Sequence, residues 1–268
     1  MIPPLGRWLL GAVFVLFVLF LYGPTLTIVV LSFQGPEGGL TFPMRGVSAV
    51  WFTRLFQPQA VGDLGAAFTR SVLLGGMVMA ATVVVSVSAA LAFRGRFRGA
   101  GVLFTLVVAS LIVPGVLVSL GVGLMFNLLG WDPSWWSSAF GAQLTWTLPF
   151  GILIMFAVFN RFDRAWEEAA RDLGASPTRV FRHVVLPIIA PGVVGIALFG
   201  FTLSYDEAAR TLLTAGSTNT LPLEIVGMTT NVTSPVLYAL GTVTTGVSLL
   251  AILAALLAMR ALRRPGAP

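Results

Sequence analysis

The chain has 268 residues, of which 57% are hydrophobic and only 10% are charged. So few polar side chains cannot cover a soluble globule of this size, and we expect membrane lipid around much of the surface. The net charge is +6, but all sixteen basic residues are Arg in short clusters between long apolar runs, which indicates membrane topology and no nucleic-acid partner. The absence of Cys and the single His183 argue against disulfides, thiol chemistry and a histidine metal cluster, so we predict no catalytic or metal-binding residues.

The apolar runs predict an all-α fold with six membrane-spanning helices. A helix needs about 20 mostly apolar residues to cross a bilayer core, because unsatisfied backbone groups are costly in hydrocarbon. Two short runs, Leu144–Phe159 and Ile188–Leu203, reach this length only with neighbouring residues. The six predicted spans lie at about 9–31, 72–93, 102–124, 141–159, 188–207 and 238–259. The third and fourth spans can kink at Pro114 and Pro149. We expect the whole chain, residues 1–268, to form a single membrane domain.

The positions of the Arg residues predict the orientation, because Lys and Arg are retained on the cytoplasmic side of short loops. An inside N-terminus places twelve Arg residues in the cytoplasm and leaves four outside, namely Arg45, Arg54, Arg70 and Arg210. A topology with one short span fewer would place an Arg-rich loop outside. We therefore expect six spans and two cytoplasmic termini.

Two features flank the first span. Arg7 precedes an apolar run, as in a signal peptide, but the run exceeds the roughly 7–15 apolar residues of such peptides and no A-x-A-like site follows Leu31. We therefore expect a retained span. In the outer loop that follows, apolar residues recur at helical spacing and predict a short interfacial helix: Val47, Val50, Trp51, Leu55 and Phe56.

The connection between the fourth and fifth spans, residues 160–187, reads as two helices separated by a tight turn. Gly174 suits the left-handed position just past a helix end. Ser176 can cap the next helix with its hydroxyl, and Pro177 fits its first turn, where no backbone donor is needed. Pro187 marks the point at which we expect the second helix to give way to the fifth span.

The same segment is amphipathic. Arg164 with Glu168, and Glu167 with Arg171, are spaced i to i+4 for ion pairs along the first helix. Apolar side chains on the two helices could dock into a groove on a partner or pack against the chain's own spans: Ala169, Ala170, Leu173, Val180, Phe181 and Val184.

The spacing within this segment resembles the EAA motif of ABC importer permeases. The matching residues are Glu168, Ala169, Ala170, Gly174, Val184, Leu186 and Pro187, with Val184 at a position that usually holds Ile. The resemblance implies a type I ABC importer permease fold in a bacterial inner membrane. It also implies that the segment is a coupling helix seated on an ATPase, with contacts from Glu168, Ala169, Ala170, Gly174, Leu186 and Pro187.

The chain contains no G-x-x-x-x-G-K-[ST] phosphate-binding loop, so we expect it to bind no cofactor and to be no enzyme. ATP and Mg would be bound by partner subunits. One six-span chain encloses little by itself, so a paired permease is expected. The resemblance implies two ATP-binding cassette subunits, a second, non-identical permease and an extracytoplasmic substrate-binding protein.

Tyr205, Asp206 and Glu207, at the outer end of the fifth span, are the candidate substrate-pathway residues. Carboxylates at membrane depth are costly and are retained where they face water, a pathway or a partner. The alternative is a solvated ion pair between Asp206 and Arg210, which are spaced i to i+4. The sequence alone leaves both open.

This region resembles the second permease subunit of spermidine/putrescine importers, through Leu203-Ser-Tyr-Asp-Glu207, Leu221-Pro222 and the stretch from Ser234-Pro235 to Ala239-Leu240. The resemblance implies a polyamine cargo, and an acidic pair suits a cationic amine. Two departures are Ala208-Ala209-Arg210 and Glu224, and Arg210 could instead select an anionic or zwitterionic ligand. A phosphonate, an amino acid and a metal chelate therefore stay as alternative cargoes, and an ion-coupled secondary transporter stays as the alternative class.

Overall fold

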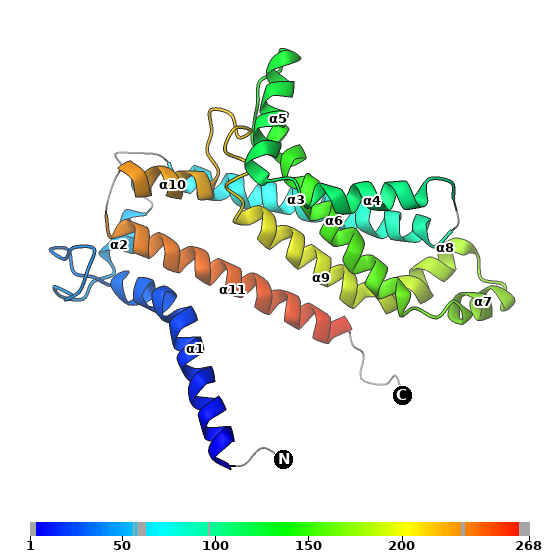
Figure 1. The fold of residues 1–268 in the computed structure, drawn as a ribbon, viewed down its shortest axis with the longest axis horizontal. Coiled ribbons are helices and arrows are strands. Elements are labelled where there is room, and N and C mark those ends of the chain that lie inside the picture. Colours follow the sequence, from blue (N-terminus) through cyan, green and yellow to red (C-terminus); the bar gives the residue numbers. More distant parts are fainter. Residues whose placement is uncertain (1–3, 56, 58–62, 96, 232–233, 263–268) are drawn as a thin grey trace. The chain divides into compact units, whose positions relative to one another are not determined.

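The structure is a computed structural model that describes residues 4–55, 57, 63–95, 97–231 and 234–262 (Figure 1). The described chain is helical, apart from an isolated antiparallel bridge between Gln34 and Val47. Its elements are α1 (Pro4–Leu31), α2 (Val50–Arg54), α3 (Leu64–Phe93), α4 (Ala100–Ser110), α5 (Gly115–Leu128), α6 (Ser138–Asn160), α7 (Ala165–Asp172), α8 (Pro177–Val180), the π-helical turn η1 (Phe181–Val185), α9 (Leu186–Tyr205), α10 (Leu221–Asn231) and α11 (Val236–Leu262). They form two compact units, one from the described parts of 1–65 and 225–247 and the other from those of 66–224 and 248–268.

The long helices confirm the prediction of an all-α membrane protein. Within the described residues, five helical segments are long and apolar enough to cross a bilayer: Gly6–Leu31, Leu64–Phe93, Ser138–Asn160, Pro177–Tyr205 and Val236–Leu257. Pro149 lies inside α6 without ending it, which is common for membrane helices because neighbouring groups satisfy the freed carbonyl. The predicted first, second, fourth, fifth and sixth spans each fall on one of these segments.

The third predicted span, 102–124, is wrong as a continuous helix. The structure has two helices, α4 and α5, whose axes differ by 106° across a break of a few residues. Pro114 is the N-cap of α5 and has an extended ψ of 134°. The helix therefore cannot continue through this residue, and α5 begins after it in a different direction from α4. With 11 and 14 residues, the helices are about 16 and 21 Å long, and neither alone matches a hydrocarbon core of about 30 Å.

In the first unit, Gln34 organises the loop that follows α1. Its side-chain oxygen accepts a hydrogen bond from the backbone of Arg45 at 2.8 Å, and its carbonyl accepts one from the indole of Trp51 at 2.7 Å. The predicted short helix at Val47–Phe56 is present as α2, although Phe56 lies outside the described residues. Trp51 is buried in the loop and does not project outward.

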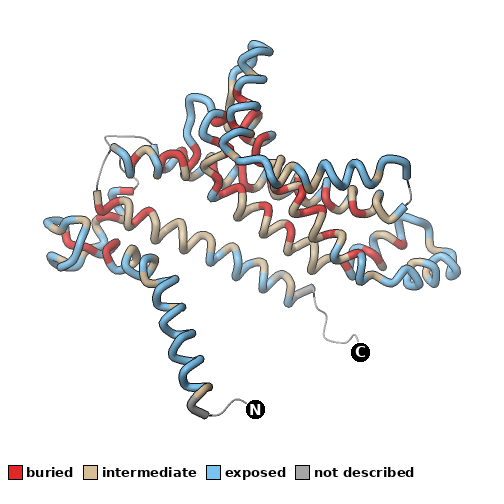
Figure 2. Tube along the Cα trace, in the orientation of Figure 1, coloured by how far each residue is buried: buried red, intermediate tan, exposed pale blue. Residues whose placement is uncertain are grey.

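The core of the second unit lies where α3, α6 and α9 pack together in one buried cluster, and Figure 2 shows buried positions recurring along α6 and α9. Polar side chains join the three helices inside this core. Thr82 of α3 donates to Thr147 of α6 at 3.0 Å, and Ser204 of α9 donates to the side-chain oxygen of Gln143 of α6. Such interhelical hydrogen bonds stabilise helix packing where water is absent.

Candidate functional site

The predicted turn at Gly174 is present. The backbone N–H of Gly174 donates to the carbonyl of Arg171 at 2.8 Å, and that of Ala175 donates to the carbonyl of Ala170 at 3.0 Å. These two bonds form a Schellman motif, in which the residue after the helix end takes a left-handed conformation. Gly174 has φ = +81°, a left-handed conformation that glycine adopts without the steric cost that a Cβ would bring.

The helix after the turn differs from the prediction in two respects. Ser176 is the N-cap of α8, but its hydroxyl makes no capping hydrogen bond, so the predicted cap is wrong. Pro187 does not separate a loop helix from the fifth span, because α8, η1 and α9 follow one another without a break from Pro177 to Tyr205. Pro187 has no amide hydrogen and its ring crowds the carbonyl four residues earlier, and the wider π-helical turn of η1 lies at that place.

The motif residues divide between exposed and seated positions. Glu168, Ala169 and Gly174 are exposed, Ala170 is half-buried, and Leu186 and Pro187 are exposed on the continuous helix. Trp166 of α7 and Leu173, the C-cap residue of α7, are also exposed, by 63% and 89%. The opposite side of the segment is seated on the core through Val180 and Val185, which join a buried cluster with Ala90, Met155, Phe159, Ile189 and Ile196. The segment thus packs on the spans and keeps an uncovered face that includes Glu168.

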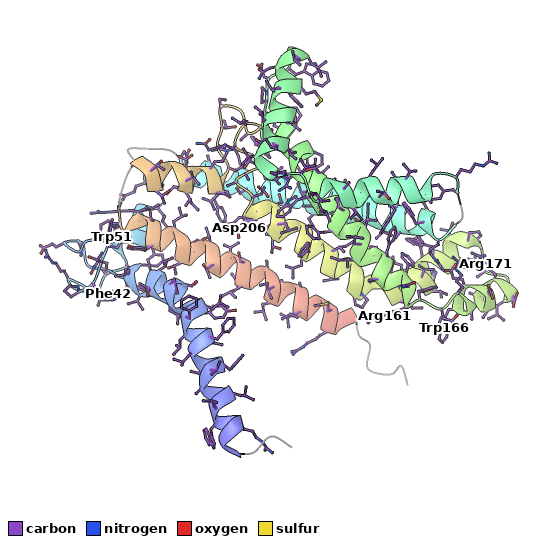
Figure 3. All side chains as sticks on the ribbon, viewed as in Figure 1. Phe42, Trp51, Arg161, Trp166, Arg171 and Asp206 are labelled. Carbon is purple, nitrogen blue, oxygen red and sulfur yellow. The ribbon has the colours of Figure 1, made fainter. Side chains whose placement is uncertain are left out.

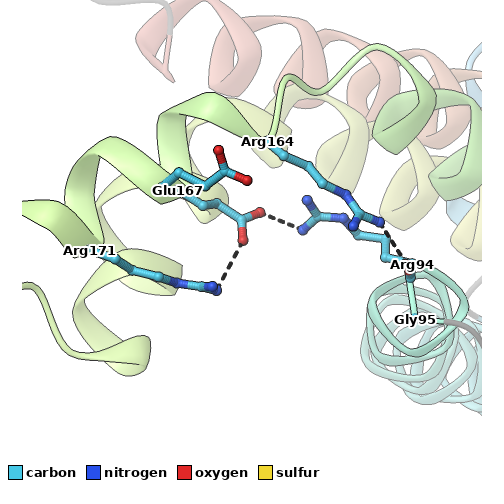
Figure 4. Close-up of a pocket in the computed structure, with 6 residues that line it drawn as sticks. Arg94, Gly95, Arg164, Glu167 and Arg171 are labelled. Atoms are coloured by element: carbon cyan, nitrogen blue, oxygen red, sulfur yellow. Dashed lines mark hydrogen bonds and ion pairs between the residues drawn. The ribbon is translucent and has the colours of Figure 1, made fainter.

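Charged residues connect α7 to the end of α3 (Figure 4). Arg94 forms an ion pair with Glu167 at 2.5 Å, and Glu167 also pairs with Arg171 at 3.4 Å, which confirms the second i to i+4 spacing. Arg164 does not bond to Glu168 but donates to the carbonyl of Arg94 at 2.6 Å. These four residues, with Gly95 and Glu168, line a cavity of about 280 Å³.

The second candidate site lies where α9 ends. Tyr205 is the last residue of α9 and is buried, with its ring stacked on Phe201 at 5.8 Å and edge-on to Phe68 at 6.4 Å. Asp206, labelled in Figure 3, caps the helix and is exposed, whereas Glu207 is buried. The three predicted pathway residues therefore face different surroundings, and only the Asp206 side chain is exposed among them.

Glu207 pairs with Arg210, so the predicted solvated pair between Asp206 and Arg210 is wrong. The Glu207 carboxylate accepts hydrogen bonds from the backbone N–H of Arg210 at 2.9 Å and from its guanidinium at 3.2 Å. The guanidinium also donates to Thr145 at 3.4 Å and lies 4.5 Å from the ring centroid of Trp146. Both charged side chains are less than 10% exposed. The turn after α9 places the backbone N–H and the guanidinium of Arg210 beside the carboxylate of Glu207, and not beside that of Asp206.

The loop from Asp206 to Thr220 is fixed to the neighbouring helices by hydrogen bonds to its backbone. Ser119 of α5 accepts from the N–H of Leu213 at 2.8 Å, and Ser138 of α6 donates to the carbonyl of Thr214 at 2.7 Å. Both contacts lie in the same unit as the Glu207–Arg210 pair. The loop thus holds a defined position beside α5 and α6.

Several contributors to these sites were not predicted. Thr145 and Trp146 lie in the fourth span, about 65 residues before Arg210, and appeared only as part of an apolar run. Arg94 counted only toward membrane orientation, yet it contacts α7 from α3. A Trp and two hydroxyls within a predicted span were the available signal for the site at the end of α9, and no sequence signal indicated the contact between Arg94 and α7.

Residues 82–264 match the model of a family described as "Binding-protein-dependent transport system inner membrane component". The chain belongs to this family. The match covers both candidate sites and runs from α3 to the C-terminal region. It makes the chain a multi-pass inner-membrane component of a transport system.

Relatives of known role cover nearly the whole chain. The spermidine/putrescine transport system permease protein PotC of Escherichia coli (strain K12) is 30% identical over 261 residues, which are 96% of each chain. The putrescine transport system permease protein PotI of the same strain is 29% identical over 234 residues, covering 85% of this chain and 82% of that one. These likenesses confirm the predicted resemblance to polyamine-type permeases.

Solved structures confirm the fold. A bacterial ABC transporter involved in the import of the acidic polysaccharide alginate has a chain with a TM-score of 0.67 at 17% identity, with 97% of this chain and 96% of that chain covered. An inward-facing form of the MetNI methionine ABC transporter has one with a TM-score of 0.57 at 18% identity, with 75% and 94% covered. The chain therefore has the type I ABC importer permease fold.

Proposed function

We propose that the chain is the permease subunit of an ATP-driven, binding-protein-dependent importer whose cargo is a polyamine such as spermidine or putrescine. The observation that carries the proposal is the 30% identity to a spermidine/putrescine permease over 96% of both chains. The exposed motif residues of α7 supply a site for the ATPase contact, and the exposed Asp206 supplies a site for the cargo.

Energy enters through α7. Its exposed residues include the apolar Trp166, Ala169 and Leu173, spaced i, i+3 and i+7, and the carboxylates of Glu168 and Asp172, a surface that fits a groove on an ATPase. With Ala170, Gly174, Leu186 and Pro187, these residues form the proposed coupling site. ATP and Mg would bind the partner ATPases, and closure of two such subunits would displace α7 as a rigid body.

The displacement would travel from α7 toward the cargo through one continuous helix. The Schellman turn at Gly174 joins α7 to α8, and α8 continues through η1 and α9 to Tyr205. At about 1.5 Å per residue, this helix of 29 residues is long enough to cross the membrane. Asp206 lies directly after its end. In this topology both chain termini and α7 are cytoplasmic, and Asp206 faces the outer side.

The charges around Asp206 support a cationic cargo. Arg210 is committed to Glu207 and to the face of Trp146, so the guanidinium is not presented to an anion. The Glu207 charge is compensated by the same pair, which leaves the exposed Asp206 as the carboxylate that can attract an ammonium group. This arrangement disfavours a phosphonate, whose charge is negative.

The proposed assembly contains this chain, a second and non-identical permease, two ATP-binding cassette subunits and an extracytoplasmic binding protein. The test is to purify the intact importer, identify the chains that co-purify, and place it in proteoliposomes with ATP inside. Spermidine or putrescine uptake that requires the loaded binding protein is expected. Glu168→Lys should weaken ATPase co-purification and abolish uptake, because it reverses an exposed charge on α7, whereas Asp132→Lys, the same charge reversal at an exposed position outside α7, serves as the matched control.

Two results would contradict the proposal at different levels. If another solute stimulates ATP hydrolysis and polyamines do not, the cargo assignment is wrong and the importer assignment stands. If uptake follows an ion gradient without the ATPase subunits, the chain is a secondary transporter, and the coupling role of α7 is wrong as well.

A further inference from the structure

Arg94 joins three helices at the end of the membrane core next to α7. It follows Phe93, the last residue of α3, and its guanidinium pairs with Glu167 of α7. In the reverse direction, Arg164 donates to the main-chain carbonyl of Arg94. We call Arg94, Arg164 and Glu167 the Arg94 clasp. The clasp connects the end of α3 to α7 through two side chains: that of Arg94 contacts Glu167, and that of Arg164 contacts the backbone of Arg94.

The guanidinium of Arg94 is also held by the end of α6. Its central carbon lies 5.1 Å from the ring centroid of Phe159 and 5.0 Å from that of Phe162. The two rings are 6.1 Å apart and tilted by 65°, so they form adjacent aromatic walls for the cation. The Arg94 and Glu167 side chains are 17% and 13% exposed, so solvent screens their pair less than it screens an exposed one.

The sequence supplies α7 with direct connections to α6 and to α8, but not to α3. Four residues separate α6 from α7, and the Gly174 turn follows α7 directly, whereas Arg94 precedes Glu167 by 73 positions. Without the clasp, a displacement of α7 would reach α3 only through packing on the shared core. A charge-assisted pair with a planar, five-donor guanidinium resists rotation better than apolar contacts do.

We infer that Arg94 is a positioning residue that transmits the displacement of α7 to α3, so that α3, α6 and α9 move together when ATP is used. The inference rests on the proposed role of α7 as the ATPase contact. It adds a second route to the continuous α8–α9 helix, at a residue outside the motif that marks the coupling segment. Such coupling requires a part of the protein with two alternative arrangements, whose equilibrium is shifted both by the ATPase at α7 and by the cargo at the other end of the helices.

The test measures the ATP hydrolysed per spermidine imported by the complete importer in proteoliposomes with its loaded binding protein. Arg94→Gln should raise this ratio about threefold to tenfold, because hydrolysis no longer moves α3 in step with α7. Arg94→Lys should give a smaller rise, since it keeps the charge and loses the planar fork. Arg98→Gln is the matched control, because Arg98 is an exposed Arg in the same loop, and it should keep the wild-type ratio.

Glu167→Gln breaks the clasp from the other side and should raise the ratio by a similar factor. The double variant Arg94→Gln with Glu167→Gln should raise the ratio by less than the product of the two single effects, because both single variants remove the same Arg94–Glu167 pair, while each also removes a contact of its own, with Arg171 or with the two rings. If Arg94→Gln is not recovered as an assembled complex, Arg94→Lys and Glu167→Gln carry the test.

Four outcomes decide the inference or the proposed function on which it rests. A raised ratio with non-additive single variants supports it. An unchanged ratio in Arg94→Gln and Glu167→Gln overturns it when both rates stay at their wild-type values. The same holds when uptake and hydrolysis fall in parallel, which also leaves the ratio unchanged and indicates a purely structural role. In those two cases the wild-type importer still transports spermidine and the proposed function stands. Failure of the wild-type importer to couple ATP to spermidine uptake overturns the proposed function and, with it, the inference.

Discussion

Asp206 and Glu207 are adjacent in sequence but lie in opposite surroundings, with Asp206 exposed at the end of α9 and Glu207 buried against Arg210. The end of α9 causes the difference, because the chain turns after Tyr205 and residues 207–210 fold back onto α6. Glu207 therefore acts within the fold, and Asp206 is left to act on cargo. Substitutions at the two positions should have different consequences.

Asp206→Asn should raise the KM for spermidine uptake at least about tenfold, because a hydrogen bond to a charged group contributes about 1.5 to 3 kcal/mol. The amount of assembled importer should stay at the wild-type level, since the side chain is exposed. The measurement is initial uptake rate against spermidine concentration at saturating binding protein. Asp206→Glu, which keeps the charge, is the matched control, and equal KM values for all three proteins would exclude a cargo role for Asp206.

Glu207→Gln should lower stability and not cargo affinity. It leaves the Arg210 guanidinium buried without a counter-charge, a change that typically costs about 3 to 5 kcal/mol. We expect less assembled importer after detergent extraction and a lower midpoint of thermal unfolding. The double variant Glu207→Met with Arg210→Met should recover part of the loss, because both charges are removed together. A single variant as stable as wild type would mean that the pair adds nothing to the fold.

The sequence predicted the helices well and their ends poorly. Uninterrupted apolar runs determine the long helices, since a backbone in lipid must satisfy its own hydrogen bonds, and Gly174 marked a turn that the structure contains. The bend at Pro114 was not predictable in size, because Pro149 is a similar residue in α6 and ends no helix. The difference depends on neighbouring helices and not on the proline itself.

The site residues were predictable only where the contacts are local. The EAA-like spacing lies within one segment, so its residues could be read in order along the chain. The partner of Arg210 depended on the turn after Tyr205, and its contact with Trp146 depended on the packing of α6 against α9. A contact between positions about 65 residues apart leaves no mark in a single sequence.

Gly174→Ala should destabilise the turn after α7 by about 1 to 2 kcal/mol, the cost of a left-handed conformation for a residue with a Cβ. The space is open, because no atom of the surrounding structure lies within 4 Å of the point that a Cβ would occupy, so the effect is conformational and not steric. Gly174→Asn should be better tolerated, since Asn adopts this conformation more readily. The readout is ATPase co-purification with each variant, with Gly101→Ala in α4 as the control, and a ranking in which Asn is worse than Ala would contradict the argument.

Gly151→Ala should disrupt the packing of α6 on α3. A Cβ at this position would clash with the hydroxyl of Ser86 and would lie 2.8 Å from the Thr82 methyl group, closer than carbon atoms pack. Overpacking of this kind costs about 1 to 3 kcal/mol. Gly141→Ala, in the same helix but with open space around its Cβ position, should be neutral or stabilising and is the matched control. Adding Ser86→Ala to Gly151→Ala removes the nearest atom and should restore part of the thermal stability, whereas equal midpoints for Gly151→Ala and Gly141→Ala would show that α3 and α6 do not approach this closely.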